Sequence, residues 1–193
     1  PQDGTAWLML GRLYKVSQNS PESEKAYKKA LEIDPNNEDA LTGLAMVYAD
    51  VGDTKSAAEL LRRASEKSPS VRTLVALAAA YEQLRDHMNA AATLRKALDL
   101  QPQNPEIKRG LAQNLLMADS LDEALKLFQE LAQDDPKDAQ SQLRISQIYR
   151  QQRKFEQARA AAKKASDLDP NSLEIRYNEV SLLEAEGKTD EAI

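Results

Sequence analysis

A seven-residue segment recurs along this chain and constrains its fold more than any other feature. The first copy reads KALEIDP over residues 29–35, with close copies at 96–102 and 164–170 and looser ones between them. Each copy ends in a proline, and these prolines are 34, 33, 34 and 34 residues apart: Pro35, Pro69, Pro102, Pro136 and Pro170. A fixed period of this length is typical of stacked supersecondary units that pack only on their neighbours. The sequence therefore predicts one solenoid over residues 1–193.

The bulk composition excludes several kinds of site. No cysteine occurs among the 193 residues, which rules out disulfides, thiolate catalysis and cysteine-based zinc sites. The net charge of −5 and the 30% of charged residues suit a soluble protein and disfavour nucleic acid as a partner. The longest apolar run, 74–81, is far shorter than the roughly 20 residues of a membrane span. We expect no span, and a cytoplasmic location is slightly favoured over a periplasmic or secreted one.

Each period carries two stretches with apolar residues at helical spacing. In the first unit, a stripe runs from Trp7 to Tyr14, and a second helix is expected to begin with Ser20 as its cap and Pro21 in its first turn. Pro35 should stop that second helix. The same interpretation divides the chain into repeats 4–37, 38–70, 71–104, 105–138, 139–172 and a partial repeat 173–193. Because the chain starts at Pro1 and ends inside an expected helix, we expect a piece of a longer protein.

Helices of about 13 residues are marginal alone in water, so packing between them must supply the stability. Small residues are expected where paired helices approach closely: Ala45, Ala57, Ala78, Ala90, Ala124 and Ala158. In the fourth unit, Ser120 and Glu123 have the spacing of a capping box at the start of a helix. The sequence thus predicts an all-α chain in which packing sets the stability and caps set the helix ends.

The residues at fixed positions of each unit match a known pattern. In the first unit these residues are Trp7, Leu10, Gly11, Tyr14, Tyr27, Ala30 and Pro35. With this pattern the chain resembles the tetratricopeptide repeat family over essentially its whole length. The resemblance implies an all-α, right-handed superhelical solenoid of antiparallel helix-turn-helix units. It also implies a protein-protein interaction scaffold without chemistry of its own.

The residues themselves offer no catalytic or metal centre. His87 is the only histidine, lies in an expected turn and has no serine nearby in a known local signature, so we expect no catalytic residue. One histidine without cysteine makes no zinc site, and no glycine-rich phosphate loop occurs. We therefore expect neither a metal nor any other cofactor.

Segment 139–165 is strongly basic within an acidic chain. It holds seven lysines and arginines and one acid, Glu156. A solvated charged face is the simpler interpretation. The family resemblance suggests a second one, because it implies that first helices line the concave groove. The groove positions in the C-terminal half are then Arg109, Gln113, Met117, Leu143, Arg144, Gln147, Arg150, Gln151, Tyr177, Asn178 and Ser181.

These groove positions form a polar stripe with three arginines. Since a guanidinium can donate two hydrogen bonds to one carboxylate, an acidic peptide or a C-terminal carboxylate is the leading ligand hypothesis. The carboxylate clamp of chaperone-binding members is not supported, because its positions hold Leu8, Arg12, Gly43, Arg72 and Ala76. The asparagine ladder of the O-linked N-acetylglucosamine transferases is not supported either, since only Asn178 fits it.

Two alternatives to peptide binding stay open. The first is self-assembly into a homo-oligomer, because the partial last repeat leaves an apolar stripe of Val180, Leu183 and Ala192 without its usual covering helix. The second is that the chain is the substrate-positioning arm of a larger enzyme.

Overall fold

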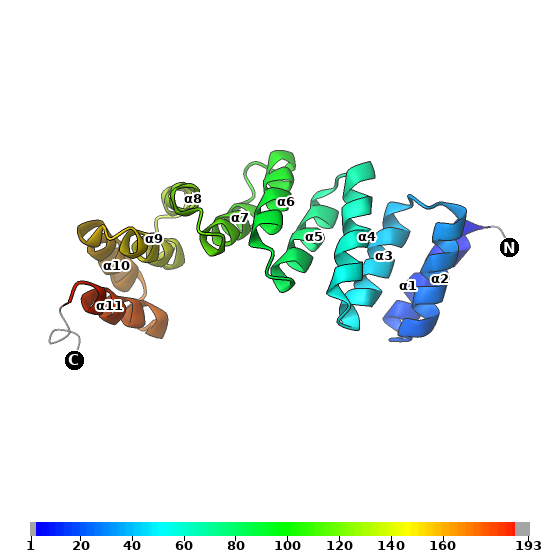
Figure 1. The fold of residues 1–193 in the computed structure, drawn as a ribbon, viewed down its shortest axis with the longest axis horizontal. Helices are drawn as coiled ribbons and strands as arrows, with labels where there is room; N and C mark the ends of the chain where they lie inside the picture. The colour runs from blue at the N-terminus through cyan, green and yellow to red at the C-terminus, as the bar shows by residue number, and fades with distance from the viewer. Residues whose placement is uncertain (1–2, 188–193) are drawn as a thin grey trace. The chain divides into compact units, whose positions relative to one another are not determined.

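The computed structural model describes residues 3–187, and this part of the chain consists of eleven helices without a strand (Figure 1). The helices are α1 (Gly4–Val16), α2 (Ser20–Ile33), α3 (Glu38–Asp50), α4 (Thr54–Lys67), α5 (Val71–Gln83), α6 (His87–Leu100), α7 (Pro105–Met117), α8 (Leu121–Asp134), α9 (Ala139–Gln151), α10 (Phe155–Leu168) and α11 (Leu173–Ala185). Odd-numbered helices, the first of each repeat, have 13 residues, and even-numbered ones have 14. The predicted all-α class and the predicted helix length are confirmed.

Two compact units make up the chain, residues 1–107 and 108–193, and the division falls inside α7. In the first unit, α1 packs on α2, α3 on α4 and α5 on α6 as helical hairpins. In the second unit, α9 and α10 form such a hairpin, and α8 and α11 pack against it. Ala192, which belongs to the predicted apolar end stripe, lies outside the described residues.

The first helices end in one kind of turn, whose middle residue has a positive φ. The φ angles are 58° at Gln18, 83° at Gly52, 58° at Arg85, 60° at Asp119, 57° at Arg153 and 78° at Gly187. In the first turn, the amide of Asn19 donates to the carbonyl of Tyr14, and the amide of Gln18 donates to that of Lys15. This pair of bonds is the Schellman motif, which satisfies the free carbonyls at a helix end.

The caps of the second helices differ from two predictions. Ser20 is the first residue of α2 and not its cap, because Asn19 is the N-cap and accepts a hydrogen bond from the amide of Glu22. The prediction for Ser20 was wrong because the preceding turn ends one residue earlier than the sequence suggested. Ser120 is the N-cap of α8, but its hydroxyl makes no capping hydrogen bond, so the serine half of the predicted capping box does not form.

Small residues allow the helices of each hairpin to approach closely. All six alanines predicted at such positions are buried: Ala45, Ala57, Ala78, Ala90, Ala124 and Ala158. Two glycines do the same around one aromatic ring, because Tyr27 of α2 lies between Gly11 of α1 and Gly43 of α3. A methyl group added to Gly43 would lie 2.4 Å from Cζ of Tyr27, and one added to Gly11 would lie 2.7 Å from Cε1. The two glycines therefore form a slot that only glycine can provide while the ring is in place.

Candidate functional site

The predicted groove residues lie on the first helices α7, α9 and α11, in the second compact unit. Arg109 of α7 donates to Oδ2 of Asp138 at 2.8 Å and to the hydroxyl of Ser141 at 3.3 Å. Asp138 is the N-cap of α9, and its side chain is only 8% exposed. Arg109 therefore ties its own helix to the start of the next first helix.

The carboxylate of Asp138 is held in its charged form by three donors. Burial alone would raise the pKa of Asp138, but the hydroxyl and amide of Ser141 and the guanidinium of Arg109 outweigh it and keep this pKa below its usual value. Two of the donors come from α9 itself and the third comes from α7. The charge on Asp138 in turn holds the Arg109 guanidinium in place.

Arg144 of α9 is fixed in a similar way. Its Nη1 lies 3.0 Å from Oε1 of Glu174 on α11 and donates to Oε1 of Gln147 at 2.8 Å. Arg144 and Gln147 are both predicted groove residues, and this hydrogen bond joins them directly. Each of Arg109 and Arg144 is thus oriented by an acid near the start of the following first helix, and both remain partly open to solvent.

The other predicted residues differ in how far they are open to a ligand. Tyr177 is 74% exposed, and Met117 and Gln151 are also exposed. Gln113, Arg150 and Ser181 are half-buried.

Two of the predicted groove residues are buried instead. Asn178 is only 2% exposed and donates to the hydroxyl of Ser146 at 2.9 Å, so it joins α11 to α9. Leu143 is fully buried, which contradicts its predicted place on the groove face, because it packs with Ala165 and Ile175 in the core.

The basic segment 139–165 is partly neutralised by acids. Arg144 pairs with Glu174, and Arg159 pairs with both Glu156 and Glu186. The simple count of charges along the sequence therefore overstates the positive field of this segment, because two of the three pairs join it to acids from α11 and the turn after it.

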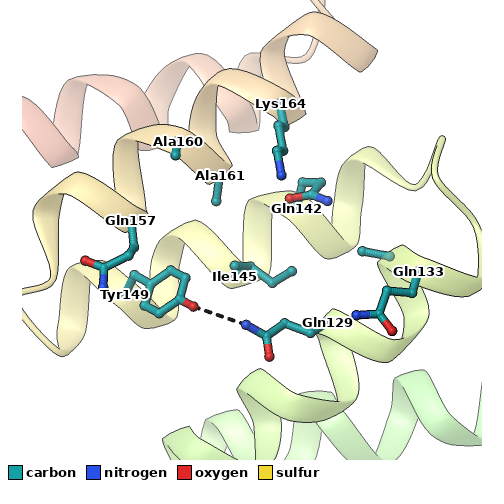
Figure 2. Close-up of a pocket in the computed structure, with 10 residues that line it drawn as sticks. Gln129, Gln133, Gln142, Ile145, Tyr149, Gln157, Ala160, Ala161 and Lys164 are labelled. Carbon is teal, nitrogen blue, oxygen red and sulfur yellow. Dashed lines mark hydrogen bonds between the residues drawn. The ribbon is translucent and has the colours of Figure 1, made fainter.

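A pocket of about 520 Å³, which sequence reasoning missed, lies on the side of the second helices α8 and α10, with α9 between them (Figure 2). It is lined by Gln129, Ala132, Gln133, Gln142, Ile145, Tyr149, Gln157, Ala160, Ala161 and Lys164. Figure 2 shows the amide of Gln129 directed at Tyr149, and its Nε2 donates to the tyrosine hydroxyl at 3.1 Å. None of the predicted groove residues lines this pocket. The four glutamines were the available signal, but their meeting depends on contacts between three helices.

Comparisons with known families cover nearly all of the described chain. The model of the cytochrome c-type biogenesis protein H TPR domain matches residues 1–93, and two tetratricopeptide repeat models match residues 81–144 and 139–172. The chain is a tetratricopeptide repeat (TPR) protein. This confirms the family predicted from the repeated residues. Proteins of this family are typically non-catalytic scaffolds for protein-protein interactions.

Solved TPR structures share the fold. The crystal structure of YrrB, described as a TPR protein with an unusual peptide-binding site, is 22% identical with a TM-score of 0.81, and the match covers 92% of each chain. A crystal structure of MamA is 21% identical with a TM-score of 0.74, over 86% of this chain and 92% of that one. At this identity the likeness shows the helical-hairpin fold alone.

The chain spans only a small part of the length of the curated relatives that it matches. The human PEX5-related protein is 32% identical over 75 residues, which are 39% of this chain and 12% of the relative. The human protein O-mannosyl-transferase TMTC1 is 27% identical over 187 residues, which are 94% of this chain and 21% of the relative.

No helix among residues 3–187 combines the length and the apolar character that crossing a membrane requires. The same residues contain no group of three or more histidine, cysteine or acidic side chains placed to hold a metal ion.

Proposed function

We propose that this TPR chain is a non-catalytic scaffold that binds an acidic segment or C-terminus of a partner protein on the first helices of its second unit. The observation that carries the proposal is the orientation of Arg109 and Arg144. Each guanidinium is held by an acid near the start of the next first helix, and each arginine side chain stays partly exposed to solvent. A fixed guanidinium loses little conformational entropy when it binds a carboxylate.

The polar side chains around these arginines support the same ligand. Gln147 is hydrogen-bonded to Arg144 and is half-buried, while Arg150 lies one turn further along α9. The exposed ring of Tyr177 on α11 offers an apolar surface to a peptide side chain. A peptide that crosses α9 and α11 would meet donors at its carboxylates and an aromatic ring beside them.

The test uses a displayed library of random C-terminal peptides, selected on the intact chain. The dissociation constants of the selected peptides are then measured with Arg109→Ala, Arg144→Ala and the double charge reversal Arg144→Glu/Arg150→Glu. We expect each single variant to weaken binding by about tenfold, since a hydrogen bond to a charged group contributes about 1.5 to 3 kcal/mol. Lys126→Ala, which removes an exposed cation from second helix α8, should leave the affinity unchanged. Unchanged affinity in all three arginine variants would refute the proposal.

Self-assembly remains a second candidate, because the outer first helices expose apolar side chains. On α1, Val16 is 83% exposed, and Met9 and Leu13 are more than half exposed. On α11, Leu173 and Val180 are exposed. Light scattering over a hundredfold range of protein concentration tests self-assembly. A molar mass that rises with concentration in the parent chain, and is lower in Leu13→Glu than in the parent chain, supports it. A constant monomer mass in the parent chain excludes it.

The arm of a larger enzyme is a third candidate, which the likeness to protein O-mannosyl-transferase TMTC1 over 94% of this chain favours. The length of the intact gene and the presence of a catalytic domain beside the repeats decide it.

A further inference from the structure

The pocket beside the second helices of the second unit coincides with a departure from the repeat. It measures about 520 Å³, within the range of about 300 to 1,000 Å³ that ligand sites occupy. Gln142 of α9, which lines it, is equivalent to Leu41 and Leu74 of the second and third repeats, and both of those leucines are buried. An amide therefore lines the pocket at a position that two other repeats fill with hydrocarbon.

In the fourth repeat, the polar residue at this position is paired within the protein. Lys108 is equivalent to Gln142, and its Nζ lies 3.4 Å from Oε2 of Glu130 and 3.2 Å from Oδ2 of Asp134. The residue of the fifth repeat that is equivalent to Glu130 is Lys164. The fourth repeat thus joins a lysine to two acids, whereas the fifth has a glutamine and a lysine in the places of Lys108 and Glu130.

Lys164 supplies the charge of this pocket. The described residues that line the pocket include no acid and no other lysine or arginine. Lys164 is exposed on α10, and Figure 2 shows its side chain extending toward the amide of Gln142. Within residues 3–187, its ammonium makes no hydrogen bond and no ion pair. Since the lining has one positive charge and no negative one, a ligand with a single negative charge complements it.

Four glutamine amides and a tyrosine hydroxyl are the other polar groups of the lining. The amide of Gln129 is oriented, because its Nε2 donates to the hydroxyl of Tyr149 at 3.1 Å (Figure 2). The side-chain amides of Gln133, Gln142 and Gln157 make no hydrogen bond within the described part of the chain. A glutamine amide is both a donor and an acceptor, as a peptide group is, so these amides suit the backbone of an extended segment.

Small side chains give such a backbone access to the amides. Ala132 and Ala160 line the pocket, and each contributes only a methyl group. Ala161 and Ile145 also line it and are buried, and the fourth repeat has the larger Leu127 in the place of Ala161. A peptide chain can therefore approach the glutamines without displacing a large side chain.

We propose that this pocket binds an internal, extended segment of a partner protein, with the segment's backbone hydrogen-bonded to the glutamine amides and one acidic side chain paired with Lys164. The rest of the segment is uncharged, because no second charge lines the described pocket. The inference goes beyond the proposed function and does not depend on it, since Arg109 and Arg144 do not line this pocket. A chain with both sites would hold two segments at once.

The experiment selects segments from a library of random heptapeptides, each held between two folded carrier domains so that no free terminus reaches the intact chain. Dissociation constants of the selected segments are then measured with Gln142→Leu and Lys164→Glu. Gln142→Leu restores the leucine of the second and third repeats, so it should keep the urea midpoint of the parent chain. We expect segments with one acidic residue, whose binding weakens about tenfold or more in each variant.

Two further measurements separate direct contact from indirect effects. Lys163→Glu is the matched control, because this exposed lysine precedes Lys164 on α10 and does not line the pocket, and it should change the affinity by less than about twofold. A selected segment whose acid is replaced by lysine should bind Lys164→Glu more tightly than it binds the parent chain. A merely structural role of Lys164 does not produce this exchange of preference.

The outcomes distinguish this pocket from the proposed groove site. A selection that enriches no segment, or segments that keep full affinity in both Gln142→Leu and Lys164→Glu, overturns the inference. Segments that weaken in Arg109→Ala or Arg144→Ala, and in neither pocket variant, support the proposed function and overturn the pocket. Segments that weaken only in the two pocket variants support the pocket, whether or not the groove binds a peptide.

Discussion

The slot around Tyr27 makes a sharp prediction for Gly43→Ala. Alanine is favoured over glycine inside a helix by about 1 kcal/mol, so the change would stabilise α3 if the site were open. The added methyl group, however, would lie 2.4 Å from Cζ and 2.8 Å from Oη of Tyr27. Ordinary carbon contacts lie at about 3.5 to 4.0 Å, so the ring or the helix must move by more than about 1 Å.

The ring has little room to retreat, because α1 confines it on the other side at Gly11. Overpacking of a core costs about 1 to 3 kcal/mol, and a site closed on both sides belongs at the upper end. With the helix propensity gain subtracted, we expect a net loss of about 2 kcal/mol in the free energy of unfolding, measured by urea denaturation and far-ultraviolet circular dichroism.

Two controls separate the slot from general effects of the substitution. A methyl group added to Gly4 would meet Ile33 at an ordinary 3.5 Å, so Gly4→Ala should cause no loss. In a Tyr27→Leu background, Gly43→Ala should lose much less stability than in the parent chain, because the clashing atoms are absent. A Gly43→Ala chain that is as stable as the parent would refute the description of the slot.

Other residues give further predictions. Phe128→Ala should lower the free energy of unfolding by about 3 to 5 kcal/mol in urea denaturation, since this ring is fully buried in α8. Because the folded-state pKa of Asp138 is lowered, its charge stabilises the fold above about pH 4 and this contribution disappears as the pH falls through the folded pKa. The Asp138→Asn chain should therefore lose less stability than the parent between about pH 5 and pH 2, and an equal loss would contradict the role of Asp138. Ala90→Leu should lower the urea midpoint more than Lys96→Leu, because Ala90 is fully buried and Lys96 is exposed; equal shifts would refute the close approach at Ala90.

Most of the fold was predictable from the sequence, because the repeat makes each unit an independent copy of the same evidence. Helix number, helix length and the buried alanines follow from the spacing of apolar and small residues. The ends of the helices were less predictable. Gln18 and Arg85 adopt positive φ where glycine is expected, so the turn cannot be recognised from residue type alone. Ser20 followed by Pro21 looks like a helix start, but the geometry of the preceding turn gives the cap to Asn19.

The candidate site was predictable only in its location. The pattern places Arg109 and Arg144 on first helices, but it does not show that Asp138 and Glu174 hold them, because these partners lie about one repeat further along the chain. The pocket lined by the four glutamines was hidden for a different reason. Gln142 occupies a core position of the repeat, and only the packing of α8 and α10 on α9 shows that it lines a pocket.

The turns between paired helices also determine where the repeat can gain or lose residues. The last residue of each turn serves both helices, since its amide closes the first helix and it is also the N-cap of the second: Asn19, Asp53, Asp86, Ser120 and Lys154. An inserted residue would separate these two roles and rotate the second helix by about 100° relative to its buried stripe. The connections between repeats share no residue in this way, and their length does vary, with three residues between α4 and α5 but four between α2 and α3. We therefore expect insertions, fused domains and new termini to be tolerated at the connections, whereas the turns within hairpins keep a constant length.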